Sequence, residues 1–86
     1  MKKIIRYFKR RRAKKELIES FQLCCRFLDY CKTKQGLKAT RAAFRELYNE
    51  YLKEYGPDDD TAFCMSHIDH KYLKRIVSLT HKNEEK

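Results

Sequence analysis

The sequence has few of the residues that end or redirect secondary structure. It contains two glycines and one proline, whereas a β-rich fold needs such residues at its frequent turns. No apolar run approaches the length of about 18 residues that a membrane-spanning helix requires. The apolar residues near the N-terminus, Ile4 and Ile5, lie too close to charged residues to form the core of a signal peptide. We therefore expect an all-helical, intracellular protein of the cytoplasm, or of the nucleus if the host is eukaryotic.

The sequence also lacks the motifs that support catalysis. Its only glycines, Gly36 and Gly56, cannot form a glycine-rich phosphate-binding loop. The acidic run 58–60 has neither the spacing nor the distal glutamate of a calcium-binding loop. No pattern places a histidine beside an exposed cysteine together with a third, orienting group, as a thiol nucleophile needs. We expect a protein that is not an enzyme and that binds no cofactor.

The cysteines and histidines do not have the spacing of a metal site. Cys64, His67 and His70 belong to residue types that zinc accepts. On one helix, however, Cys64 and His70 point about 120° apart, so a single ion cannot readily meet all three side chains. The paired CxxC spacing is missing as well. We expect no metal site, exposed histidines, and cysteines that are reduced residues of the core.

Apolar residues recur at helical spacing in three segments. The predicted helices are 16–35, 38–55 and 61–81, followed by a polar tail at 83–86. The connections between them are short, which favours antiparallel neighbours. The predicted fold class is all-α: a small three-helix bundle over residues 16–82, whose first helix is extended by a cationic N-terminal arm, residues 1–15.

Residues that cap helices mark the ends of these segments. Gly36 is predicted to end the first helix, and Gly56, followed by Pro57, the second. Asp60 or Thr61 is predicted to cap the start of the third. The apolar faces between these caps define the predicted core, which consists of Leu17, Ile18, Phe21, Cys24, Cys25, Leu28, Phe44, Leu47, Tyr51, Met65, Ile68, Tyr72, Ile76 and Leu79.

Charge is distributed unevenly along the chain. The arm carries nine Lys and Arg residues and no Asp or Glu, which equals the formal net charge of +9 of the whole chain. Positions 16–86 are therefore neutral. Such an asymmetry indicates a segment that interacts with a polyanion. The cations predicted to bind it are Lys2, Lys3, Arg6, Lys9, Arg10, Arg11, Arg12, Lys14 and Lys15.

The arm also contains apolar residues that cannot share the core of the bundle. On one straight helix, Ile4, Ile5 and Phe8 point nearly opposite to the core stripe that begins at Leu17, by about 150–180°. No strong helix-breaking residue lies between the two groups. We expect the first helix to continue into the arm and to carry this apolar patch away from the core.

We predict a small nucleic-acid-binding protein with an accessory or regulatory role, favouring RNA or non-specific DNA. Lysine and arginine neutralise phosphates and release condensed counterions, and guanidinium groups make bidentate phosphate contacts. Tyr7 and Phe8 offer rings that can stack on unpaired bases. Ile4 and Ile5 are candidates for insertion beside them.

Two alternatives use the same arm. A small adaptor or inhibitor, of the kind that viral genomes encode, would dock the arm on an acidic surface of a larger protein. A peripheral membrane protein would insert the apolar residues of the arm at the interface of an anionic membrane. Tyr30 and Tyr55 lie at the edges of the apolar stripes and are candidates for an interface with a partner, including a homodimer.

Overall fold

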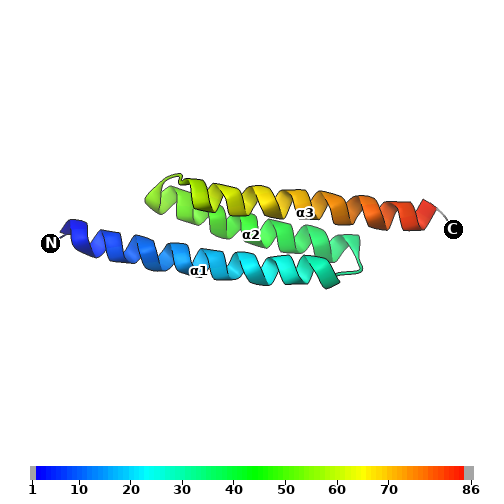
Figure 1. Cartoon of the computed structure of the whole chain (residues 1–86), viewed down its shortest axis with the longest axis horizontal. Helices are drawn as coiled ribbons and strands as arrows, with labels where there is room; N and C mark the ends of the chain where they lie inside the picture. The colour runs from blue at the N-terminus through cyan, green and yellow to red at the C-terminus, as the bar shows by residue number, and fades with distance from the viewer. Residues whose placement is uncertain (1, 85–86) are drawn as a thin grey trace.

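The structure is a computed structural model that describes the backbone of residues 2–84 and the side chains of residues 4–80. Within these limits it contains three helices and no strand: α1 (Lys2–Tyr30), α2 (Lys34–Tyr55) and α3 (Asp59–Glu84). The predicted all-α three-helix bundle is confirmed. Figure 1 shows that α1 and α3 run in the same direction and that α2 runs antiparallel to both.

The molecule is a staggered rod with extents of 63 × 17 × 16 Å. Each helix packs against the other two. The first turns of α1 reach past the α2–α3 connection at one end, and the last turns of α3 reach past the α1–α2 connection at the other (Figure 1). The first helix continues through the arm without a break, as predicted. The arm is therefore a helical extension that lies partly beside the bundle and partly beyond it.

The first helix ends earlier than predicted. α1 ends at Tyr30, and Gly36 lies in the first turn of α2, so the predicted capping of the first helix by Gly36 is wrong. Thr33 starts the second helix instead, because its backbone is extended and its hydroxyl oxygen accepts a hydrogen bond from the Gly36 amide at 3.1 Å. This is the geometry of an N-cap, which the sequence analysis assigned to no residue here.

Two carbonyls at the end of α1 accept hydrogen bonds from another helix. Arg75 of α3 donates hydrogen bonds to the carbonyl oxygens of Leu28 at 3.0 Å and of Cys31 at 2.6 Å. Charged donors make the stronger class of hydrogen bond. A side chain distant in the sequence thus performs the role that was expected of a local glycine.

The second connection follows the prediction at its start and departs from it at its end. Gly56 has a positive φ of 85°, and its amide donates to the Leu52 carbonyl, as a glycine that ends a helix does. The third helix begins at Asp59, earlier than predicted. Its cap is Asp58, whose Oδ1 accepts from the Thr61 amide at 2.9 Å, so the predicted capping by Asp60 or Thr61 is wrong.

Most of the predicted core is confirmed, with one correction and one addition. The buried apolar residues are Leu17, Leu28, Leu37, Phe44, Tyr51, Cys64, Met65, Ile68 and Tyr72. Leu47 was predicted to be in the core but is 42% exposed, because α2 directs Phe44 and Tyr51 inward and Leu47 towards its border with α1. Leu37 was not predicted, because it lies in the first turn of α2, outside the predicted helix. Cys64 is buried, as expected of the cysteines.

Candidate nucleic-acid interface

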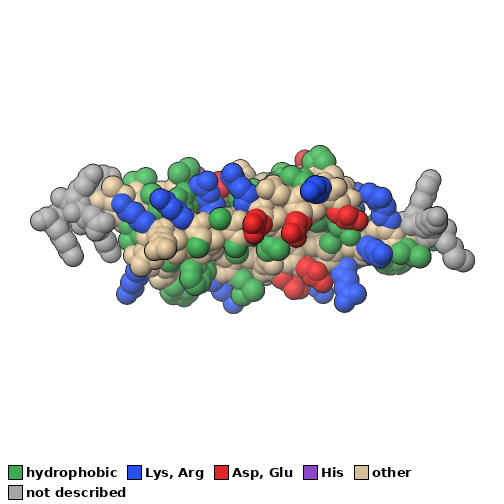
Figure 2. All heavy atoms as spheres, turned by 180° about the vertical axis from the view of Figure 1, so that it is seen from behind, with side chains coloured by type: hydrophobic (Ala, Val, Ile, Leu, Met, Phe, Trp, Pro, Cys, Tyr) green, Lys and Arg blue, Asp and Glu red, His purple; other side chains and the backbone are tan. Residues whose placement is uncertain are grey.

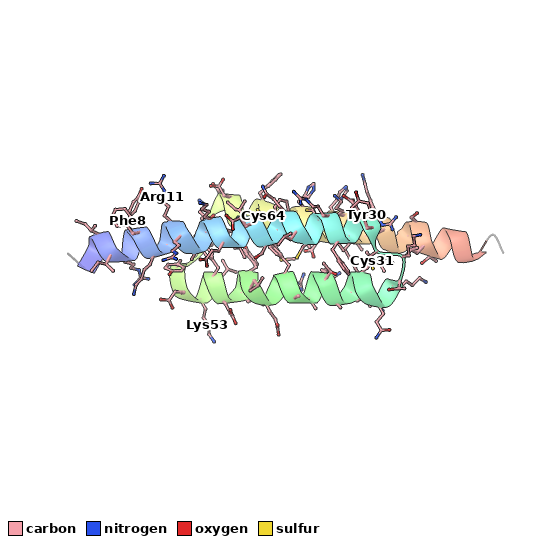
Figure 3. All side chains as sticks on the ribbon, turned by 90° about the horizontal axis from the view of Figure 1, so that it is seen from below. Phe8, Arg11, Tyr30, Cys31, Lys53 and Cys64 are labelled. Carbon is pink, nitrogen blue, oxygen red and sulfur yellow. The ribbon has the colours of Figure 1, made fainter. Side chains whose placement is uncertain are left out.

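The N-terminal half of α1 divides its cations between two sides of the helix. Figure 3 shows Phe8 and Arg11 projecting from α1 on the side away from α2, and Lys53 projecting from α2 in the opposite direction. Other cations of the same helix face the bundle. The side chains of Lys2 and Lys3, which the sequence analysis counts among the cations, lie outside the described residues. The division therefore concerns residues 4–15.

Three cations, Arg6, Arg10 and Lys14, face the bundle, and we call them the bundle-facing cations. Arg6 Nη2 donates to the Glu54 carbonyl at 3.1 Å, at the C-terminal end of α2, where a positive charge is favourable. Arg10 Nη2 lies 3.8 Å from Asp58 Oδ2. Lys14 Nζ lies 2.7 Å from an Asp60 carboxylate oxygen and 3.8 Å from Asp58 Oδ1. These contacts attach the arm to the α2–α3 connection.

Asp58 is the centre of this attachment. Its side chain is 12% exposed, and its Oδ2 accepts a hydrogen bond from the Tyr51 hydroxyl at 2.7 Å. Burial by itself raises the pKa of the Asp58 carboxyl, but the Thr61 amide, the Tyr51 and Thr61 hydroxyls and the Lys14 ammonium outweigh burial and lower the pKa below its usual value. Asp58 is thus held ionised, and it holds Arg10 and Lys14 in turn.

Four other cations, Lys9, Arg11, Arg12 and Lys15, are exposed, and we call them the outward cations. Arg12 Nε lies 3.7 Å from Glu16 on the next turn, but its side chain is 86% exposed, and such a pair contributes little. Among the described side chains, Lys9, Arg11 and Lys15 form no ion pair. The outward cations are therefore available to a polyanion, whereas the bundle-facing cations already have partners within the fold.

Large apolar side chains are exposed beside the outward cations. Ile4, Ile5, Tyr7 and Phe8 are all more than half exposed. The rings of Tyr7 and Phe8 meet edge to face, with centroids 5.7 Å apart. The apolar patch thus lies away from the core, as the sequence analysis expected, on the part of α1 that extends furthest from the bundle.

The third helix adds little free charge to this surface. Lys71 Nζ lies 2.9 Å from Asp29 Oδ1 of α1, and the Arg75 guanidinium is occupied by α1 carbonyls. Lys74 and His70 are exposed. These contacts show which side of α1 borders α3. Arg11 precedes Asp29 by 18 residues, about five turns, and therefore points to the same side of α1.

The residues considered for a metal do not form a site. Cys64 is buried, whereas His67 and His70 are exposed, and the described residues contain no group of side chains that could hold a metal ion. The His67 ring packs against Phe21 and Phe63, with centroids 5.6 and 6.0 Å away. Burial, followed by the nearby Cys25, raises the pKa of the Cys64 thiol, which keeps it protonated.

The two tyrosines predicted for an interface lie in different surroundings. Tyr30 is 81% exposed at the end of α1. Tyr55 is half-buried against Tyr51, with ring centroids 5.3 Å apart.

In the described part of the chain, no helix has an apolar stretch long enough to cross a bilayer.

Sequence reasoning missed the two residues that organise the ends of the bundle, Asp58 and Arg75. A signal for the first was present: Arg6, Arg10 and Lys14 follow one another at intervals of four, which places them on one face of α1. No comparable signal pointed to Arg75.

No family model matches this chain, and no curated protein or solved structure matches it significantly.

Proposed function

We propose that this protein is a small nucleic-acid-binding accessory protein and that the outward cations of α1 are its phosphate contacts. The supporting observation is the division of charge on one helix. Arg10 and Lys14 already pair with Asp58 and Asp60, and Arg6 donates to the Glu54 carbonyl. Among the described side chains, the outward cations have no ion-pair partner except the exposed contact of Arg12 with Glu16. Phosphates attract such groups without regard to sequence, so RNA or non-specific DNA is the favoured ligand.

The attachment of the arm supports this proposal in a second way. A disordered cationic segment loses conformational entropy when it binds, whereas a helix held at Asp58 is already ordered. Tyr7 and Phe8, exposed beside the cations, provide rings for unpaired bases. We propose a binding role without enzymatic activity, exercised in the cytoplasm.

Fluorescence anisotropy with labelled RNA and DNA at several salt concentrations tests the proposal. Each neutralised phosphate contributes about 0.9 to the slope of log K against log salt for duplex DNA and about 0.7 for single strands. Replacing Arg11 and Lys15 with glutamine should therefore lower the slope by about 1.4–1.8. The matched control replaces Lys38 and Lys53, two exposed lysines of α2, and should leave the slope unchanged.

Two results would count against the proposal. Binding that is absent at moderate salt would exclude it, and equal losses in the two double variants would show that only net charge matters. Anionic vesicles are measured in parallel, because the exposed Ile4, Ile5 and Phe8 also suit a membrane surface. A preference for vesicles that disappears when these three residues become serine would favour the membrane alternative.

A further inference from the structure

A groove runs along the border between α1 and α2, and one half of it is apolar. Leu23 and Phe27 of α1 form one wall, and Ala39 and Ala43 of α2 form the other. Leu23 is 64% exposed and Phe27 is 55% exposed, so the small side chains of α2 leave these two residues uncovered. A row of large exposed side chains beside a row of small ones forms a groove into which another helix can pack its side chains.

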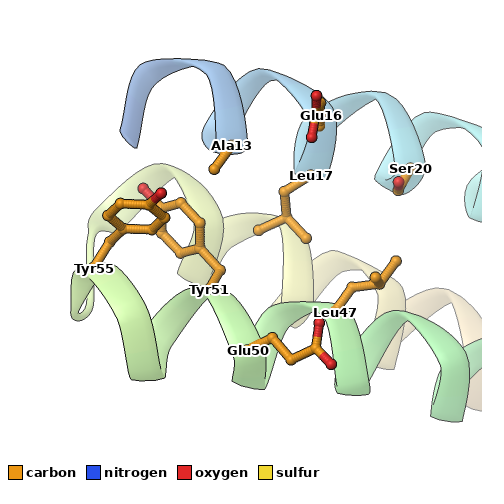
Figure 4. A pocket seen from close by; sticks show the side chains of 8 residues that line it. All are labelled: Ala13, Glu16, Leu17, Ser20, Leu47, Glu50, Tyr51 and Tyr55. Atoms are coloured by element: carbon orange, nitrogen blue, oxygen red, sulfur yellow. The ribbon is translucent and has the colours of Figure 1, made fainter. Parts of the chain in front are cut away.

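A second hollow lies further along the same α1–α2 border, and we call it the acidic half of the groove because two glutamates flank it. Its lining includes Glu16 of α1 and Glu50 of α2, with Leu17 and Leu47 between them. Figure 4 shows Leu17 pointing from α1 towards α2, and Leu47 pointing from α2 towards α1. Figure 2 shows acidic side chains gathered near the middle of one face of the molecule, with apolar side chains between them. From the C-terminal end of α1 towards its middle, the groove therefore changes from apolar to acidic.

The arm has a complementary order of residues. Its first turns expose Ile4, Ile5 and Phe8, and Lys9 and Arg12 follow one turn later. From Phe8 to Arg12 is four residues, about 6 Å along the helix. Glu19 also precedes Leu23 by four residues, and it is exposed beside the acidic half of the groove. An arm laid antiparallel in the groove thus meets apolar residues with apolar ones and glutamates with cations.

We propose that a second copy of this chain occupies the groove, with its arm antiparallel to α1. Because both partners present the same arm and the same groove, each arm lies in the groove of the other copy, and the contact closes with two-fold symmetry. The complementary charges fix the orientation: a parallel arrangement would place the cations of one arm beside those of the other. Ile5 and Phe8 of the arm are covered in this dimer.

This dimer does not depend on the proposed function. It places Lys9, Arg12 and Phe8 in the interface and leaves the other two outward cations, Arg11 and Lys15, for phosphates. Ile5 and Lys9 border α2, and Phe8 projects away from α2 (Figure 3), so the dimer uses the solvent face of the arm between these residues. Arg11 lies on the α3 side, with Lys15 one turn further along the helix. The two-fold axis keeps the α3 sides of both copies on one surface of the dimer. Arg11 and Lys15 of both copies then form a single cationic surface near the axis.

Sedimentation equilibrium of the whole chain tests the dimer directly. At about 100 μM, a concentration at which an interface with a micromolar Kd is occupied, the wild type should have twice its monomer mass of 10.5 kDa. Replacing Leu23 and Phe27 with aspartate should raise the dimer Kd by at least about tenfold, equivalent to about 1.4 kcal/mol. The control places aspartate at Leu73 and Val77 of α3, which are 56% and 52% exposed, and should leave the Kd unchanged. Circular dichroism confirms that each variant is folded.

A mixing experiment tests the arm-in-groove arrangement itself. A groove variant, Leu23→Asp with Phe27→Asp, has an intact arm, and an arm variant, Ile5→Asp with Phe8→Asp, has an intact groove. Each alone should be monomeric, whereas their mixture restores one of the two contacts and should form heterodimers. A monomeric wild type, a dimer insensitive to the groove variant, or a mixture no more associated than its components would overturn the proposal. Anisotropy with the groove variant, which retains Arg11 and Lys15, tests nucleic-acid binding separately.

Discussion

At each end of the bundle, cationic side chains of one helix bind groups elsewhere in the fold, but the groups that they bind differ. At one end, cations of α1 reach the α2–α3 connection, where Asp58 gathers Arg10 and Lys14. At the other end, Arg75 of α3 reaches the last carbonyls of α1. One end depends on an ionised carboxylate, and the other depends on neutral carbonyl oxygens.

This difference has a consequence for the arm. The Asp58 end determines where the N-terminal half of α1 lies, because three cations of the helix converge on it. The Arg75 end fixes only the last turn of α1. A change at Asp58 should therefore alter both stability and the position of the outward cations, whereas a change at Arg75 should alter stability alone.

The largest effect is expected for Asp58→Ala. This substitution removes the cap of α3, worth about 1 kcal/mol, and leaves the Tyr51 hydroxyl without its acceptor, which costs about 1–3 kcal/mol more. The free energy of unfolding in urea should fall by about 3 kcal/mol, and hydrogen exchange of residues 4–14 should accelerate. Asp59→Ala, an exposed neighbour in the first turn of α3, is the control. An unchanged exchange rate in the arm would show that Asp58 does not hold it.

A smaller effect is expected for Arg75→Ala. The change removes hydrogen bonds from a charged donor to the Leu28 and Cys31 carbonyls, and we expect a loss of about 2 kcal/mol in urea unfolding. Hydrogen exchange should accelerate in the last turn of α1 and stay unchanged in the arm. Lys74→Ala, at the exposed neighbouring position, is the control. Equal effects of the two substitutions would mean that these hydrogen bonds contribute nothing to stability.

The comparison of the two ends also explains what the sequence predicts and what it does not. Periodicity placed three helices, and the continuation of α1 through the arm followed from the absence of a breaker between Phe8 and Leu17. Gly56 was identified because its role is local: the chain needs a positive φ there. Contacts within one helix or one turn leave a pattern in the sequence.

Contacts between distant residues leave much less of a pattern. Gly36 has the residue type of a helix end, yet Thr33 and Arg75 together move that end to Tyr30. The nine cations of the arm count equally in a sum of charge, but the fold neutralises some and exposes others. Which of them are available depends on the position of Asp58, a tertiary fact that composition does not contain.

The smallest effect that separates the two ends is their response to pH. Because the pKa of Asp58 is lowered in the folded state, its ionised form contributes stability that is present above the unfolded pKa, about 3.9, and is lost as pH falls through the folded pKa. The stability gap between wild type and Asp58→Asn should therefore be wide at neutral pH and narrow below about pH 4. The gap between wild type and Arg75→Ala should not narrow in this way, because the partners of Arg75 at that end are backbone carbonyls and not a carboxylate. Thermal unfolding at several pH values measures both gaps. A gap for Asp58→Asn that stays constant in acid would mean that its charge does not hold the arm.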